Sequence, residues 1–68
     1  MSNHTPAELG TLLCGNAYNK HGASIADPQS MLVSHNFESF CEGRGFDKVQ
    51  RRECEEAYQA RWKELTRE

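Results

Sequence analysis

Residue types that bind metals or act as nucleophiles are scattered along this chain of 68 residues. The three cysteines and three histidines are Cys14, Cys41, Cys54, His4, His21 and His35. A compact zinc site normally takes its ligands in closely spaced pairs, about two to five residues apart. None of these six residues is paired in that way, so the sequence predicts no bound metal and no other cofactor.

Enzyme chemistry finds equally little support in the order of the residues. Ser34 and His35 are adjacent, and neighbouring side chains on a helix diverge by about 100°, so they do not form a nucleophile and base pair. The carboxylates of Glu53, Glu55 and Glu56 belong to a highly charged segment that is typical of a solvated helix face. No glycine-rich phosphate loop follows a strand. We therefore expect a protein that is not an enzyme.

The chain is too short and too polar to bury a large core. Its mean hydropathy is -0.82 and 26% of its residues are charged. We expect a single domain over residues 1–68. A domain of this size buries a small share of its surface, so much of each helix must face water or another molecule. The longest apolar runs are Leu12–Cys14 and Met31–Val33, which predicts no secretory leader and no membrane span. The expected location is therefore cytoplasmic, or another compartment that the chain reaches without a conventional cleaved leader.

Helix-start signals predict a first helix at about 6–21. Thr5, Pro6 and Glu8 have the order of a capping residue, an initial proline and a capping-box partner. Apolar residues then recur at helical spacing until Gly22, a typical stop. Gly10 and Gly15 inside this segment each cost roughly 1 kcal/mol relative to alanine, which indicates either a close neighbour or a weak helix.

Two further helices are predicted, at about 28–43 and 47–67. The second begins at Asp27-Pro28 and carries an apolar stripe from Val33 to Cys41. The third begins at Asp47, with a capping-box glutamine three residues later. Because the connection between them is only two to four residues long, we expect an antiparallel hairpin. The predicted fold class is all-α, with three short helices, and the first helix lies across the hairpin or against a partner.

Cys41 and Cys54 are expected to meet in the seam of that hairpin. They are either two buried thiols that act as small apolar groups or a disulfide. A disulfide would close a loop of about fourteen residues and add roughly 3 kcal/mol. Cys14 has no partner in either case. The sequence leaves both alternatives open.

A family resemblance bears on the same segment. The residues that carry it are Phe37, Cys41, Gly43, Gly45, Phe46, Cys54 and Tyr58. Through them the stretch 31–65 resembles the coiled-coil-helix–coiled-coil-helix family, the twin Cys-x9-Cys hairpins of the mitochondrial intermembrane space. The outer cysteines of that pattern would fall on Met31 and Glu64, so they are absent here. The resemblance implies a structural or assembly subunit in that compartment, held by one Cys41–Cys54 disulfide.

Basic residues crowd the start of the third helix, where the helix dipole disfavours positive charge. They are Arg44, Lys48, Arg51 and Arg52. The net charge of -2 gives the whole chain no general attraction to nucleic acid. Solvated charge, docking to an acidic protein and nucleic-acid binding are all compatible with the cluster.

The second candidate surface is aromatic. Tyr58, Trp62 and Leu65 share a helix face, with Arg61 beside them, and such side chains are typical anchors of protein interfaces as well as core residues. We therefore expect a non-catalytic protein-interaction module, an accessory subunit or small regulator that binds another protein or a second copy. The alternative is a small nucleic-acid-binding regulator that uses the basic start of the third helix.

Overall fold

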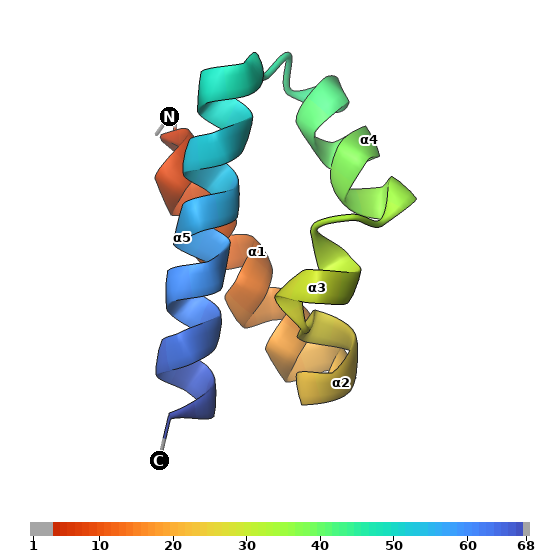
Figure 1. The fold of residues 1–68 in the computed structure, drawn as a ribbon, viewed down its shortest axis with the longest axis vertical. Coiled ribbons are helices and arrows are strands. Elements are labelled where there is room, and N and C mark those ends of the chain that lie inside the picture. The colour runs from red at the N-terminus through yellow and green to blue at the C-terminus, as the bar shows by residue number, and fades with distance from the viewer. Residues whose placement is uncertain (1–3, 68) are drawn as a thin grey trace.

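The computed structural model describes residues 4–67, and all regular structure within them is helical (Figure 1). The helices are α1 (Pro6–His21), α2 (Ala23–Ala26), α3 (Pro28–Met31), α4 (His35–Gly43) and α5 (Lys48–Thr66). The all-α prediction is confirmed, whereas the count of three helices is not. None of the described helices has the length and apolar character needed to cross a membrane.

The two long helices begin where local capping signals predict. At α1, Thr5 Oγ1 accepts a hydrogen bond from the Glu8 amide, and the Glu8 carboxylate accepts one from the Thr5 amide. At α5, Asp47 and Gln50 form the same reciprocal pair over 2.8 and 3.1 Å. These bonds satisfy amide groups that have no partner inside the helix. The starts of both helices therefore follow from a few neighbouring residues.

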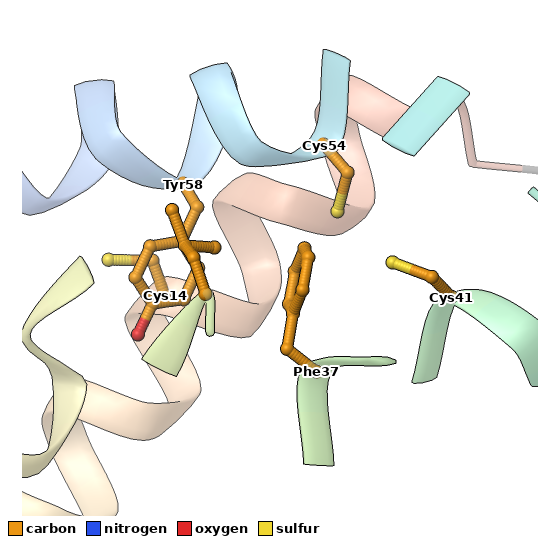
Figure 2. Close-up of a cluster of buried hydrophobic side chains, with 6 residues drawn as sticks. Cys14, Phe37, Cys41, Cys54 and Tyr58 are labelled. Carbon is orange, nitrogen blue, oxygen red and sulfur yellow. The ribbon is translucent and has the colours of Figure 1, made fainter. Parts of the chain in front are cut away.

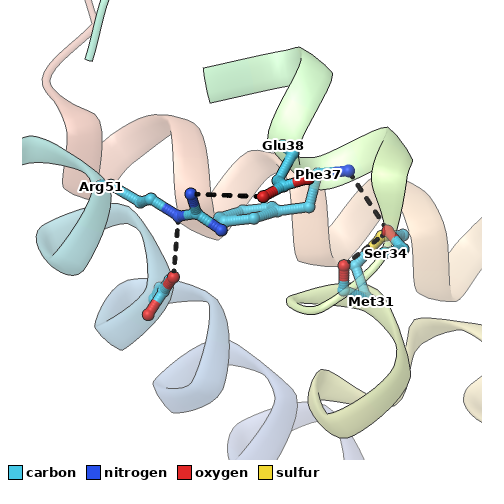
Figure 3. A network of polar contacts seen from close by, with 6 residues as sticks. Met31, Ser34, Phe37, Glu38 and Arg51 are labelled. Atoms are coloured by element: carbon cyan, nitrogen blue, oxygen red, sulfur yellow. Dashed lines mark hydrogen bonds and ion pairs between the residues drawn. The ribbon is translucent and has the colours of Figure 1, made fainter. Parts of the chain in front are cut away.

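The helix predicted over 28–43 is interrupted after its first turn. Met31 ends α3, and α4 begins only at His35. Ser34 produces the break, because its hydroxyl donates to the Met31 carbonyl oxygen over 2.7 Å and accepts from the Phe37 amide over 3.2 Å (Figure 3). Serine competes for backbone hydrogen bonds in this way and favours helix starts over helix interiors. The break leaves Val33 on an exposed turn.

The predicted antiparallel hairpin is not confirmed. The turn that joins α4 to α5 has the expected glycine ending, since Gly45 has a φ of 71° and the Phe46 amide donates to the Cys41 carbonyl oxygen over 3.1 Å. Beyond this turn, however, α4 leans away from α5 (Figure 1). The principal neighbour of α5 is instead α1, which lies alongside it.

The core lies where α1, α4 and α5 meet (Figure 2). Its fully buried side chains include Tyr58, at 0% exposure, and Phe37, at 1%. The Tyr58 hydroxyl donates to the Ala26 carbonyl oxygen over 2.6 Å and so ties α5 to the end of α2. A buried phenol normally requires such a partner. This bond links the connector after α1 to α5.

Candidate functional site

The basic residues predicted to bind a partner do not form one free cluster. Arg44, Lys48 and Arg52 are exposed, but Arg51 is half-buried and faces α4. Its Nε lies 3.2 Å from Glu55 Oε2, and one terminal nitrogen lies 3.9 Å from Glu38 Oε1 (Figure 3). Arg51 is therefore neutralised on both sides by residues of its own chain.

Both arginines near the turn also rest on aromatic rings. The guanidinium of Arg44 lies 4.9 Å from the centre of the Phe40 ring, and that of Arg51 lies 5.8 Å from the centre of Phe37. These are ordinary cation–π distances. The arginines thus help cover the core, which leaves Lys48 and Arg52 as the basic side chains that contribute charge alone.

The predicted aromatic face is divided between core and surface. Tyr58 belongs wholly to the core, so its side chain is not available to a partner in this conformation. Trp62 and Leu65 are half-buried, and Trp62 makes an edge contact with Tyr18 across α1 and α5, with ring centres 6.0 Å apart. Arg61 forms an ion pair with Glu64 over 3.2 Å. Trp62 is thus the aromatic residue of this face that remains accessible.

Trp62 opens onto a groove between α5 and the segment that includes α3 and the turn after it. We call this the α3–α5 groove; it has a volume of about 800 Å³. Its large apolar side chains are Leu32, Val33 and Trp62, and its charged ones are Asp27, Glu38, Arg51, Glu55 and Lys63. A surface that combines apolar side chains with charged ones is typical of protein contact surfaces.

Val33 is the most exposed large apolar residue among those described, at 79% of its surface. Leu32 beside it is 7% exposed and packs into the core. The prediction that placed Val33 on the buried stripe of a continuous helix is therefore wrong, because the Ser34 break turns it outward. The sequence signal for this groove residue was Ser34 itself, a capping residue three positions before Phe37.

All three cysteines are buried free thiols in this structure, and the proposed Cys41–Cys54 disulfide is not formed in it. Figure 2 shows Cys41 and Cys54 near the ring of Phe37. Burial raises the pKa of all three thiols, and raises that of Cys54 to about 11 with a smaller contribution from the neighbouring Cys41. Since the thiolate is the reactive form, this environment favours packing and not catalysis.

Because the Cys54 thiol and the Tyr58 phenol are buried, we expect the protein to lose stability at alkaline pH. The pKa of Cys54 rises from 9.0 to about 11 and that of Tyr58 from 10.0 to about 12, both chiefly through burial. The folded state therefore prefers the protonated groups, and this preference is complete below about pH 9 and is lost as the pH rises through 11. We expect the urea midpoint to stay level between pH 7 and 8.5 and to fall from pH 9 to 11, with Cys54→Ala reducing the slope. A midpoint independent of pH up to 11 would contradict this assignment.

Other candidate chemistry is not assembled among the described residues. Ser34 is committed to capping α4, as its hydrogen bonds show. Within residues 4–67 no three histidine, cysteine or acidic side chains come close enough to hold a metal ion together. The α3–α5 groove, which combines the exposed Val33 with Trp62, is the surface feature from which we infer a function.

Comparison with known proteins adds no relative to this description. No protein-family model, no curated protein and no solved structure matches the chain. The resemblance of residues 31–65 to the twin Cys-x9-Cys hairpins thus stays a prediction that rests on its own residues. Any function inferred for the chain therefore depends on the geometry of the α3–α5 groove.

Proposed function

We propose that this chain is a non-catalytic protein-interaction module whose α3–α5 groove binds a protein, either a different one or a second copy of the chain. The observation that carries the proposal is the exposure of Val33, at 79%, beside the apolar groove residues Leu32 and Trp62. Single exposed apolar residues are common on protein surfaces and need no explanation. An exposed apolar residue at the edge of a groove that also holds a tryptophan is a different case, because interface anchors concentrate in such places.

The groove is well suited to binding because its parts are held in place before any partner arrives. Ser34 fixes the turn that carries Val33 through two hydrogen bonds. Trp62 is held against Tyr18 of α1, and Arg51 is held by two carboxylates. Side chains that are already ordered lose little conformational entropy on association. An accessory subunit or a small regulator of a larger assembly would both use a surface of this kind.

Nucleic-acid binding is the weaker alternative. It would rely on Lys48 and Arg52, with Arg44 nearby, at the start of α5. Arg51 is already neutralised by Glu38 and Glu55. The exposed Glu53 directly follows Arg52, and the exposed Glu56 lies one turn after it, so their carboxylates would repel phosphates. Protein binding is therefore the function that we favour.

Two valines provide a matched test of the groove. Val33 and Val49 are both strongly exposed, at 79% and 67%, but only Val33 lines the groove. We expect Val33→Glu to reduce the amount of protein partner retained by the immobilised chain about tenfold or more, because a carboxylate replaces an apolar side chain that the bound partner would cover. Val49→Glu adds the same charge elsewhere and should retain the wild-type amount, as measured by quantitative mass spectrometry of the retained proteins.

The comparison requires that both valine variants keep the wild-type fold. Because both valines are exposed, neither substitution should change the melting temperature by more than a few degrees. If neither the retention of any protein nor the self-association of the chain distinguishes Val33→Glu from Val49→Glu, the groove is not the binding surface and the proposal fails.

A further inference from the structure

The side of α5 that borders the groove carries opposite charges on the two sides of a central glutamine. Glu55, Gln59 and Lys63 all line the groove and are spaced four residues apart, so they form one row along the helix. An acidic residue lies one turn before the central glutamine and a basic residue lies one turn after it. A row with this order is complementary to itself when two copies run in opposite directions.

Resting on the proposed function, we infer that the occupant of the α3–α5 groove is a second copy of this chain. The two α5 helices lie antiparallel, and a two-fold axis passes near Gln59. Glu55 then faces the partner's Lys63, and Lys63 faces the partner's Glu55, so each contact occurs twice. Such two-fold pairing, in which the same patch serves both subunits, is the commonest way that identical chains associate.

The residues next along the row are compatible with this arrangement. Arg51 and Arg67 lie two turns from Gln59 on either side and would face each other as like charges. Arg51 also lies 3.9 Å from Glu38, a carboxylate outside the row, and this charge reduces the repulsion. The same approach covers Val33 and Trp62, which line the groove together with the row, and so removes exposed apolar surface from water.

A stable dimer would have to bury a modest part of the accessible surface of each chain. A typical stable interface buries about 800 Å² on each partner, which is roughly one sixth of the 5002 Å² accessible surface of the chain. The face that would have to supply this area includes the groove, its α5 side and the turn at Val33. The core of the monomer is small, and its largest fully buried side chains are Tyr58 and Phe37.

Charge exchange between two variants tests the inference. The purified full chain should sediment as a monomer–dimer equilibrium whose dimer fraction rises with concentration. Glu55→Lys and Lys63→Glu should each weaken the dimer about tenfold or more, because each places like charges opposite each other. An equimolar mixture of the two variants should recover a dimer, since the lysine introduced at position 55 of one chain then faces the glutamate introduced at position 63 of the other.

Controls separate this effect from damage to the monomer. Glu53→Lys changes the net charge as Glu55→Lys does, on an exposed position outside the groove, and should leave the dimer unchanged. Loss of the Glu55–Arg51 ion pair could loosen the first variant, but a folding defect would not be repaired by mixing. Val33→Glu should also weaken the dimer, and Val49→Glu should not.

Two outcomes overturn the inference. One is a chain that remains a monomer at every concentration, and the other is a wild type that dimerises while the mixed variants fail to pair. Should the chain be monomeric while retention of a different protein still depends on Val33, the second-copy inference fails and the proposed function stands. Should Val33→Glu affect neither association nor retention, both fail.

Discussion

Replacing Gly10 with alanine is expected to lower the free energy of unfolding by about 3 kcal/mol. A Cβ atom on Gly10 would overlap the backbone carbonyl oxygen of Cys54, and it would lie 3.2 Å from Ala57 Cβ. A backbone group cannot rotate aside as a side chain does, so α1 and α5 must separate. This loss outweighs the gain of about 1 kcal/mol that alanine brings to a helix. Urea unfolding followed by circular dichroism measures it.

Gly15 is the matched control on the same helix. A Cβ atom at Gly15 meets nothing within 4 Å, so Gly15→Ala should raise stability by up to about 1 kcal/mol through helix propensity alone. The two substitutions are chemically identical and should have opposite signs. Equal midpoints for the two variants would mean that α1 and α5 do not cross at Gly10.

Replacing Phe37 with alanine is expected to unfold most of the chain at 25 °C. Removal of a buried phenylalanine costs about 3–5 kcal/mol, which is comparable to the whole stability that a core of this size provides. Phe37 is 1% exposed and contacts the core from α4. For this variant we expect a narrow range of amide proton chemical shifts in the NMR spectrum and no cooperative thermal unfolding transition.

The control for Phe37 is its neighbour on the other side of Ser34. Val33→Ala removes an apolar side chain that is 79% exposed and should change stability by no more than about 0.5 kcal/mol. A Phe37→Ala variant that melts with the wild-type midpoint would show that α4 does not belong to the core.

The starts of the long helices could be predicted because their signals are local. Thr5 with Glu8, and Asp47 with Gln50, satisfy the first amides of their helices without help from the rest of the chain. The Gly45 turn belongs to the same class, since a positive φ and a short-range hydrogen bond define it.

The arrangement of the helices depended on contacts that no local pattern reveals. Gly10 and Gly15 are alike in sequence, but only Gly10 meets another helix, at Cys54. That contact helps make α1, and not α4, the main neighbour of α5, so the expected hairpin gives way to a different pairing. A glycine inside a helix indicates a close approach, but it does not say which element approaches.

The candidate site was predicted in part, for a related reason. Tyr58 and Trp62 lie one turn apart on the predicted aromatic face. Only Tyr58 is fully buried, and its hydroxyl donates to the carbonyl oxygen of Ala26, which lies 32 residues away in the sequence. Arg51 likewise differs from Arg52 because Glu38 of α4 lies beside it. The apolar stripe from Val33 to Cys41 predicts a buried Val33, but Ser34 caps α4 and leaves Val33 on the exposed turn before it.

The accessibility of Trp62 reports on whether the α3–α5 groove is a protein contact surface. The chain has a single tryptophan, so 5-fluorotryptophan labelling gives one ¹⁹F resonance from the groove. We predict that this resonance shifts or broadens as the protein concentration or the partner concentration rises, that Val33→Glu removes the change, and that Val49→Glu retains it. A resonance that stays fixed under all these conditions, or that responds equally in both valine variants, would show that the groove binds no protein.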